Sequence, residues 1–212
     1  MTSDAVRWYD QNISIVSPRY ESVTAETVHR WLVDLLPNAP ALVLDVGAGT
    51  GRDAAWLASR GLEVIAVEPS GAMRAEAQRL HPSPSIQWIA DSLPSLNHVL
   101  RLGLSFDMIL LSAVWMHVLP ADRARAFRKL VTLLKPGGCM AITLRHGPAE
   151  PERGIHAASQ AEIEHPSLRA RGLSSKRRTL ELLPLFEDQT IELHQPRAQC
   201  CRSRLVRFGN QT

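Results

Sequence analysis

The sequence has few aromatic residues, few cysteines and no long apolar run. Aromatic side chains make up 5% of the 212 residues, too few for an extended row of rings that stacks on single-stranded nucleic acid. Cys139, Cys200 and Cys201 have neither the spacing of metal ligands nor that of a disulfide framework, and reduced thiols fit a cytoplasm. The longest apolar stretch, around residues 108–116, is too short to span a bilayer. We therefore expect a cytoplasmic protein with no metal site and no membrane partner.

Neither positive nor negative charge is in large excess. The formal net charge is +3, and the excess lies in residues 151–212, which hold 10 Lys and Arg against 7 Asp and Glu. In this region "KRR" at 176–178 and spaced arginines could contact RNA or an anionic substrate. The spaced arginines are Arg197, Arg202, Arg204 and Arg207. Because no aromatic residues alternate with these cations, a solvated strand face is the favoured interpretation, and DNA is not an expected partner.

What the sequence does contain is a regular alternation of short apolar runs and helical patterns, which is typical of βαβ units around a parallel sheet. The expected strands are residues 41–46, 63–68, 86–90, 106–112 and 139–145. The expected helices are residues 52–60 before Gly61, residues 70–80 with Ser70 as N-cap, and residues 121–134 before "KPGG". The chain length suits one α/β domain.

Both ends of this region carry further elements. Residues 4–36 predict one or two amphipathic helices, in which Trp31, Leu32, Leu35 and Leu36 are spaced for burial. After residue 145 a short helix is expected at 161–170, followed by strand-like segments at 174–182 and 201–208. The expected organisation is an N-terminal helical cap (1–36), a ligand-binding core (41–145) and a C-terminal helix with an antiparallel strand pair (146–212).

The stretch "LVLDVGAGTGRDA", residues 42–54, is the strongest functional signal. An apolar strand ends in Asp45, and Gly47, Gly49 and Gly51 follow at every second position. A strand, a glycine-rich turn and a helix present backbone N–H groups and a positive helix end at the carboxyl edge of the sheet, where ligands of open α/β sheets bind. Glycine allows the ligand to approach the backbone closely.

Two acids at later strand ends indicate what the ligand contains. Glu68 ends the second strand, 17 residues after Gly51, where a carboxylate accepts both hydroxyls of a ribose. Asp91 follows the third strand, where it would either accept from an adenine amino group or cap a turn. The dinucleotide fingerprint G-x-G-x-x-G does not fit, because Arg52 occupies the place of its third glycine. A nicotinamide-dependent oxidoreductase is therefore the less favoured alternative.

Five segments together resemble the successive motifs of class I S-adenosylmethionine-dependent methyltransferases. They are "LDVGAGTGRDA", "VIAVEPS", "IADSLP", "FDMILLSAVWMHV" and "LLKPGGCMAITLR", and they span residues 41–145 in the family's order. The resemblance implies a three-layer αβα Rossmann-like fold with seven strands ordered 3-2-1-4-5-7-6, in which strand 7 is antiparallel. It also implies S-adenosyl-L-methionine as cofactor and methyl transfer as activity.

The resemblance assigns roles to residues of this chain. Asp45, Gly47, Ala48, Gly49 and Gly51 would surround the methionine end of the cofactor, Glu68 and Pro69 the ribose, and Asp91 and Ser92 the adenine. Ala113 or Val114 would lie near the sulfonium. Tyr9 and Tyr20 belong to the N-terminal segment that often closes over the cofactor, so each would either contact it or only pack there.

The methyl acceptor is less defined. The "NPPY"-type motif of nucleic-acid or protein-amide N-methylation is absent, and "SAVWMH" stands in its place. A small-molecule acceptor is the leading expectation, RNA the second, and a module that binds the cofactor without catalysis the third. His117 and His146 are candidate general bases because both follow strands that end at the ligand-binding edge. Arg145 could instead bind an acidic substrate.

Overall fold

Five parallel strands form the centre of the fold, in the order β3-β2-β1-β4-β5. The computed structural model describes residues 3–145, 147–159, 162–163, 173–176 and 205–208. The strands are β1 (Leu42–Val46), β2 (Glu63–Val67), β3 (Ile86–Ile89), β4 (Phe106–Leu111) and β5 (Leu134–Ile142). All five strands predicted from the sequence are confirmed, with ends that agree or differ by at most five residues. Two four-residue strands, β6 (Leu173–Lys176) and β7 (Leu205–Phe208), follow.

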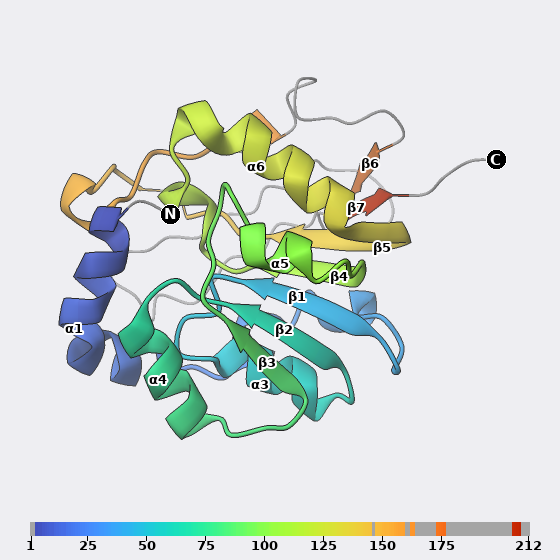
Figure 1. Cartoon of the computed structure of the whole chain (residues 1–212), viewed down its shortest axis with the longest axis horizontal. Coiled ribbons are helices and arrows are strands. Elements are labelled where there is room, and N and C mark those ends of the chain that lie inside the picture. Colours follow the sequence, from blue (N-terminus) through green and yellow to red (C-terminus); the bar gives the residue numbers. More distant parts are fainter. Residues whose placement is uncertain (1–2, 146, 160–161, 164–172, 177–204, 209–212) are drawn as a thin grey trace.

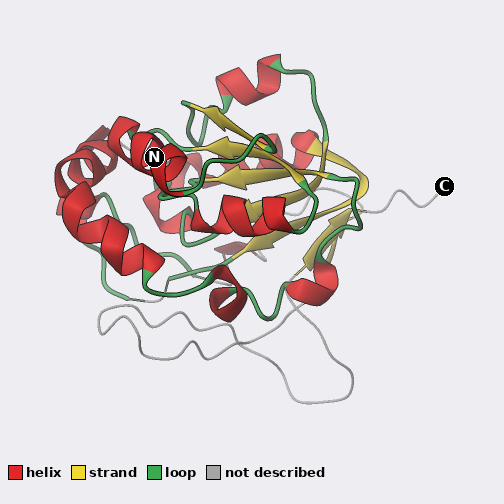
Figure 2. Ribbon diagram, turned by 90° about the horizontal axis from the view of Figure 1, so that it is seen from below, coloured by secondary structure: helices red, strands yellow, loops and turns green. Residues whose placement is uncertain are grey.

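Helices cover both faces of this sheet (Figures 1 and 2). The helices are α1 (Ser3–Glu21), α2 (Ala25–Val28), α3 (Arg52–Ser59), α4 (Gly71–Leu80), α5 (Asn97–Arg101) and α6 (Pro120–Leu133). Short 3₁₀ turns are η1 (Val33–Leu35), η2 (Trp115–His117) and η3 (Pro151–Arg153). None of the helices among the described residues is long and apolar enough to cross a bilayer.

The strands are apolar almost throughout because successive residues pack into two different cores. In β1, Leu44 packs on the side of α5 and α6, whereas Val43 packs on the side of α2 and α3. In β4, Ile109 likewise packs on the side of α5 and α6, and Met108 packs on the side of α2 and α3. This period of two, with both faces covered, is what a buried parallel strand requires.

The predicted local signals of the helices are present. Ser70 caps α4 by accepting a hydrogen bond from the backbone N–H of Met73 at 3.1 Å. Gly61 has φ +79° two residues after the end of α3, where a left-handed residue can end a helix. The N-terminal region does form two helices, α1 and α2, but α2 already ends at Val28. Of the four residues expected to be buried, Trp31 and Leu32 are buried and Leu35 and Leu36 only partly, in or beside the turn η1.

One boundary differs from the expectation. The sequence suggested that "KPGG" separates a helix ending at 134 from a strand starting at 139, but β5 already begins at Leu134. Phe106 pairs with Leu134 and Met108 with Cys139, so Lys135–Gly138 form a bulge within the strand pair. Gly138 fits there because an added Cβ would stand 2.9 Å from the carbonyl oxygen of Lys135. Most of the helix expected at 161–170, most of the segment 174–182 and half of the segment 201–208 lie outside the described residues.

Candidate functional site

Two adjoining cavities open at the carboxyl ends of β1, β2 and β4. The larger has about 370 Å³ of empty space, part of it open to solvent, and the smaller about 230 Å³. The larger is lined by Tyr9, Tyr20, Gly47, Gly49, Glu68, Met73, Ser112, Ala113, Val114 and His117. The smaller is lined by Val46, Gly47, Val67, Pro69, Asp91, Ser92, Leu93, Val114, His117 and Val118. Because Gly47, Val114 and His117 line both, the two cavities form one continuous site.

The glycine loop has the shape that its sequence predicts, and its glycines serve different purposes. Gly49 has φ +55°, and an added Cβ would meet only the Tyr20 ring, at 3.9 Å, so the backbone here is open to a ligand. Gly51 has φ +87°, and an added Cβ would stand 3.0 Å from both Ala77 and the Trp88 ring. Gly51 thus allows the start of α3 to pack closely, whereas Gly49 faces the cavity. Ala48 is buried and does not line either cavity.

Glu68 lies directly beside this loop. Its side chain is 4% exposed, and its two carboxylate oxygens accept hydrogen bonds from the backbone N–H groups of Gly49 at 3.0 Å and Ser70 at 2.9 Å. Burial raises the pKa of Glu68 to about 7, although both backbone hydrogen bonds favour the ionised form. Each oxygen keeps a further lone pair, so an ionised Glu68 can accept from two more donors.

Asp45 is the last but one residue of β1 and lines neither cavity. It is 1% exposed, and its Oδ2 atom has no hydrogen-bond partner among the described residues. Burial raises the pKa of Asp45 well above 3.8, and the nearby carboxylates of Asp53 and Glu68 raise it further against the effect of Arg52. A buried carboxylate oxygen without a partner is costly, so a cationic donor at this position would be stabilising.

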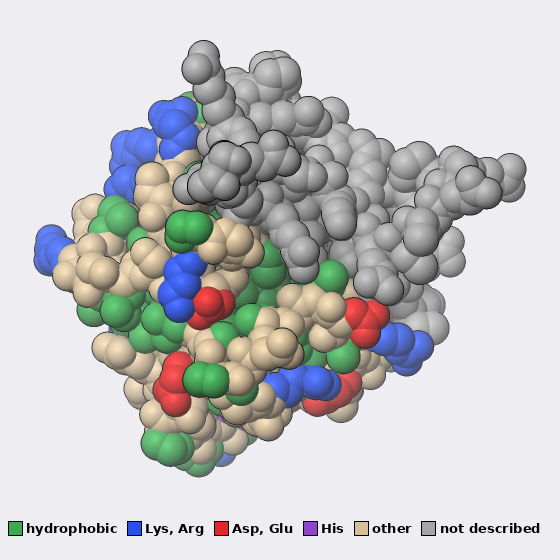
Figure 3. All heavy atoms as spheres, turned by 90° about the vertical axis from the view of Figure 1, so that its right-hand side faces the viewer, with side chains coloured by type: hydrophobic (Ala, Val, Ile, Leu, Met, Phe, Trp, Pro, Cys, Tyr) green, Lys and Arg blue, Asp and Glu red, His purple; other side chains and the backbone are tan. Residues whose placement is uncertain are grey.

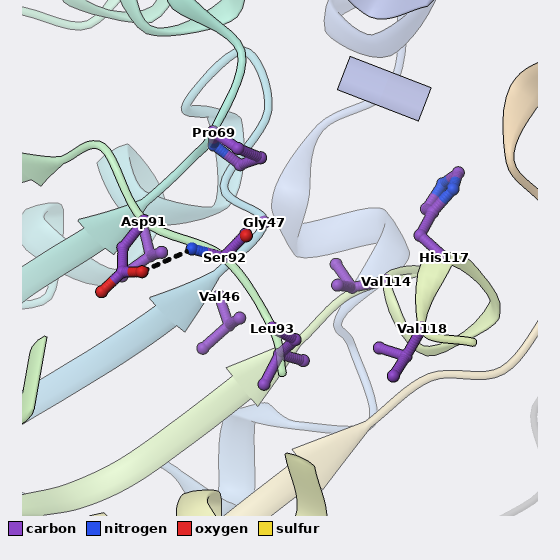
Figure 4. A pocket seen from close by; sticks show the side chains of 10 residues that line it. Val46, Gly47, Pro69, Asp91, Ser92, Leu93, Val114, His117 and Val118 are labelled. Atoms are coloured by element: carbon purple, nitrogen blue, oxygen red, sulfur yellow. Dashed lines mark hydrogen bonds between the residues drawn. The ribbon is translucent and has the colours of Figure 1, made fainter. Parts of the chain in front are cut away.

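The smaller cavity has a polar wall and an apolar wall. Figure 4 shows Asp91 and Ser92 on one side, Val114 and Val118 on the other, and Leu93 between them. Asp91 accepts from the backbone N–H groups of Ser92, His98 and Val99, at 2.8, 2.6 and 3.1 Å. Its carboxylate therefore caps α5, and Asp91 also borders the cavity, while its contact with an adenine stays a prediction.

The end of β4 forms the floor of the larger cavity. Ala113 has φ +54°, a conformation that non-glycine residues adopt uncommonly, and its N–H donates to Thr143 Oγ1 at 2.8 Å. The predicted floor residues Ala113 and Val114 both line the cavity. Val114 lies so close to the loop that its Cγ2 would be 2.5 Å from a Cβ on Gly47.

Side chains from α1 and η2 close the site on its outer side. The Tyr9 hydroxyl lies 3.2 Å from His117 Nε2 and 3.3 Å from the Tyr20 hydroxyl. His117 is 2% exposed, and burial lowers its pKa to about 4. Burial also raises the pKa of Tyr9 well above 10. All three are therefore uncharged near neutral pH.

The second candidate base, His146, lies outside the described residues. Arg145, next to it, is buried and donates to the carbonyl oxygen of Pro148 and to Glu150. Glu150 also pairs with Arg153, at 2.7 Å. Arg145 is thus held within its own loop and lines neither cavity.

Sequence reasoning missed several residues of the site. Met73 lines the larger cavity from the first turns of α4, and Val67 and Leu93 line the smaller one. Their position at or after the ends of strands that reach the rim was a usable signal, but their residue types are those of an ordinary core. Within the described residues no three His, Cys, Asp or Glu side chains gather as a metal site.

The sequence model of a methyltransferase domain family matches residues 43–138. An uncharacterised methyltransferase of Mycobacterium tuberculosis is 34% identical over 109 residues, covering 51% of this chain and 41% of the relative. A trans-aconitate 2-methyltransferase of Methylobacterium radiotolerans is 28% identical over 151 residues, covering 68% of this chain and 53% of the relative. The chain thus spans about half the length of these curated relatives.

Solved structures show the same fold. The 1,6-didemethyltoxoflavin-N1-methyltransferase of Burkholderia thailandensis, solved with 1,6-didemethyltoxoflavin and S-adenosylhomocysteine bound, superposes with a TM-score of 0.63. It is 19% identical, and the match covers 99% of this chain and 92% of that one. At this identity the likeness concerns the Rossmann-like arrangement of the parallel sheet and its helices.

Proposed function

Because the chain belongs to the class I S-adenosylmethionine-dependent methyltransferases, we propose that it transfers a methyl group from S-adenosylmethionine to a small-molecule nucleophile. The observation that carries the proposal is the continuous site at the carboxyl edge of the sheet. Its two cavities share three residues, and Glu68 and Asp91 lie at different parts of its wall. An elongated ligand with a nucleoside at one end fits such a site.

Three features of the chain match the parts of this cofactor. The buried Asp45 Oδ2 without a partner suits the ammonium group of the methionine part. Gly49 leaves the backbone open beside it, and Glu68 has lone pairs for the two ribose hydroxyls. The smaller cavity, with Leu93 and Val118 as apolar wall and Ser92 as polar wall, suits the adenine. When bound, S-adenosylmethionine supplies an electrophilic methyl group.

The larger cavity favours a small acceptor. α1 places Tyr9 and Tyr20 over it, so the acceptor must fit between this helix and the end of β4. Two proteins that resemble this chain have a small molecule in their names, trans-aconitate in one and 1,6-didemethyltoxoflavin in the other. On the face in Figure 3, some Lys and Arg side chains lie beside acidic ones, whereas several at the upper left have no acidic neighbour, so it is the size of the cavity and not this surface that favours a small acceptor. Most of the basic C-terminal segment lies outside the described residues.

Positioning of the acceptor supplies much of the rate in such a transfer, and a base is needed only when the acceptor holds a proton. His117 is the described candidate, because it lines both cavities. His146 remains a second candidate on its sequence position alone.

We also propose that residues 1–212 form one domain, with the cap, core and C-terminal parts expected from the sequence, and a sheet ordered 3-2-1-4-5-7-6. Pairing in the backbone supports the order: β7 lies antiparallel to β5, with Met140 opposite Val206, and β6 lies antiparallel to β7, with Ser175 opposite Val206.

Calorimetry and turnover test the function separately. S-adenosylmethionine and S-adenosylhomocysteine are expected to bind, whereas NAD is not. Release of S-adenosylhomocysteine above the acceptor-free rate, with a panel of small acceptors, is then expected. Binding without any turnover would support a non-catalytic module, and turnover only with RNA would support the alternative substrate. No binding of either sulfur compound would end the proposal.

A further inference from the structure

A chain of three hydrogen bonds crosses the acceptor side of the site. It runs from the Tyr20 hydroxyl to the Tyr9 hydroxyl over 3.3 Å and from Tyr9 to His117 Nε2 over 3.2 Å. It continues from His117 Nδ1 to the carbonyl oxygen of Gly154 over 3.2 Å. The four groups come from α1, η2 and the residue after η3. Methyl-donor binding explains none of the contacts at the His117 end.

The donors and acceptors along this chain of hydrogen bonds can be assigned. A carbonyl oxygen only accepts, so His117 Nδ1 carries the ring proton. In a neutral imidazole the other nitrogen, Nε2, must then accept, so the Tyr9 hydroxyl donates to it. The lone pairs of the Tyr9 oxygen are left to accept, from Tyr20 in the ligand-free protein. Tyr9 is thus an acceptor on its cavity side and a donor on its buried side.

The surroundings keep the ring neutral. Burial lowers the pKa of His117 to about 4 even though the bond to Gly154 favours the charged form, and the positive charge of Arg153 lowers it further. Tyr9 faces Tyr20, Arg153 and Glu68 as well, and burial is the largest of these influences on its pKa. Neither a stable imidazolium nor a stable phenolate is expected in the resting protein.

We propose that Tyr9 contacts the methyl acceptor and that Tyr9 and His117 together remove its proton, an inference that rests on the proposed function. A lone pair of the acceptor forms the bond to the methyl carbon, and the electron pair of the broken C–S bond stays on sulfur. The acceptor's proton passes to the Tyr9 oxygen as the proton of Tyr9 passes to His117 Nε2. Positive charge therefore moves from sulfur to the imidazole ring, which still donates to Gly154 through Nδ1–H.

This relay defines the class of acceptor. A hydroxyl, thiol or ring N–H group that keeps its proton near pH 7 needs such a pair, whereas a carboxylate is already ionised and does not. Tyr20 lies where the acceptor's X–H group has to lie, within hydrogen-bond distance of the Tyr9 oxygen. The acceptor replaces Tyr20 as the donor to Tyr9.

The tautomer of His117 can be measured without any acceptor. ¹⁵N NMR of the ligand-free protein and of its complex with S-adenosylhomocysteine at pH 7 is expected to show a protonated Nδ1 and an unprotonated Nε2. The Nε2 resonance should shift in Tyr9→Phe, which removes only the hydroxyl. A protonated Nε2 in either state overturns the proposal, because that nitrogen could not receive a proton.

Turnover tests the relay against a purely structural role. A phenol, a thiol, an imidazole and trans-aconitate serve as acceptors at pH 7. Tyr9→Phe and His117→Asn are each expected to lower turnover of the protic acceptor about 10²-fold or more, and the double variant no further than the poorer single one. Affinity for S-adenosylhomocysteine should change by less than about threefold in Tyr9→Phe, since binding does not use the proton transfer.

Ser17→Ala is the matched control for the loss of a hydrogen bond that holds α1 against α4. It removes the 3.0 Å hydrogen bond from Ser17 to Glu76 on α4 and leaves the cavity lining unchanged. Turnover close to that of the wild type is expected. An equal loss in Ser17→Ala, full turnover in Tyr9→Phe, or turnover restricted to trans-aconitate would each overturn the relay. Failure of the cofactor to bind would instead refute the proposed function.

Discussion

The affinity for S-adenosylhomocysteine is expected to rise about tenfold between pH 6 and pH 8. The cause is Glu68, whose carboxylate must be ionised to accept two ribose hydroxyls. Burial raises its pKa to about 7 in the ligand-free protein. Binding below that pH has to release a proton first, so the apparent affinity falls as the proton concentration rises.

The size of the effect follows from that pKa. At pH 6 about one Glu68 in eleven is ionised, and at pH 8 about ten in eleven, which gives a ratio of about ten. His117, whose burial lowers its pKa to about 4, stays neutral throughout this range and adds no slope. The free energy of unfolding should move in the opposite direction. The contribution from Glu68 is fully present below pH 4.5 and is lost as pH rises through 7, amounting to about 3 kcal/mol.

Calorimetry at pH 6, 7 and 8 on two matched variants isolates Glu68. Glu68→Gln cannot ionise and offers one acceptor oxygen fewer, so binding should be weak and should depend less on pH than in the wild type. Asp45, whose pKa burial also raises, keeps its own contribution in this variant. Glu76→Gln is the control, because hydrogen bonds from Arg79 and Ser17 lower the pKa of Glu76 to about 2 and it does not line the site. It should follow the wild type. A flat wild-type profile, or an unchanged slope in Glu68→Gln, would show that Glu68 does not bind the ribose.

Two further predictions concern the loop and the helix that follows it. Gly49→Ala and Gly103→Ala both place a side chain at positive φ, +55° and +63°, so each should lower the free energy of unfolding by about 1 kcal/mol. Only Gly49→Ala should weaken S-adenosylhomocysteine binding in calorimetry; equal binding in both variants would remove Gly49 from the site. Asp53→Ala should cost about 3–5 kcal/mol in urea unfolding, because the buried His29 and the partly buried Arg52 lose the carboxylate that they contact at 2.7 and 2.8 Å. A loss below about 1 kcal/mol would contradict that estimate of a buried pair.

The arrangement of the glycine loop and Glu68 could be predicted from the sequence because its signals are local. A β-strand period, glycines and an acid at a strand end lie within about 30 residues, and the parallel register brings them to one edge. Glu68 and Gly49 are 19 residues apart and share a hydrogen bond. The predicted helix caps are local for the same reason.

The acceptor half could not be predicted in the same way. Tyr9 and His117 are 108 residues apart, and nothing in either segment identifies the other. The sequence placed both near the site but treated them as separate candidates. The contact between His29 and Asp53, with the ring stacked on Trp56 at 5.6 Å, escaped for the same reason. Such pairs depend on how helices cross over the sheet, which no local pattern records.

Hydrogen bonds of Asp10 nevertheless connect the two parts of the site. Asp10 on α1 accepts hydrogen bonds from the Ser70 hydroxyl and, at 3.1 Å, from the backbone N–H of Ala72, while the backbone N–H of Ser70 donates to Glu68. The helix that supplies Tyr9 to the acceptor is therefore attached to the turn that orients the proposed ribose acid. Asp10 also raises the pKa of Glu68. Displacing α1 would thus alter both the proton relay and the ionisation of Glu68, so cofactor affinity and proton transfer are coupled through this helix.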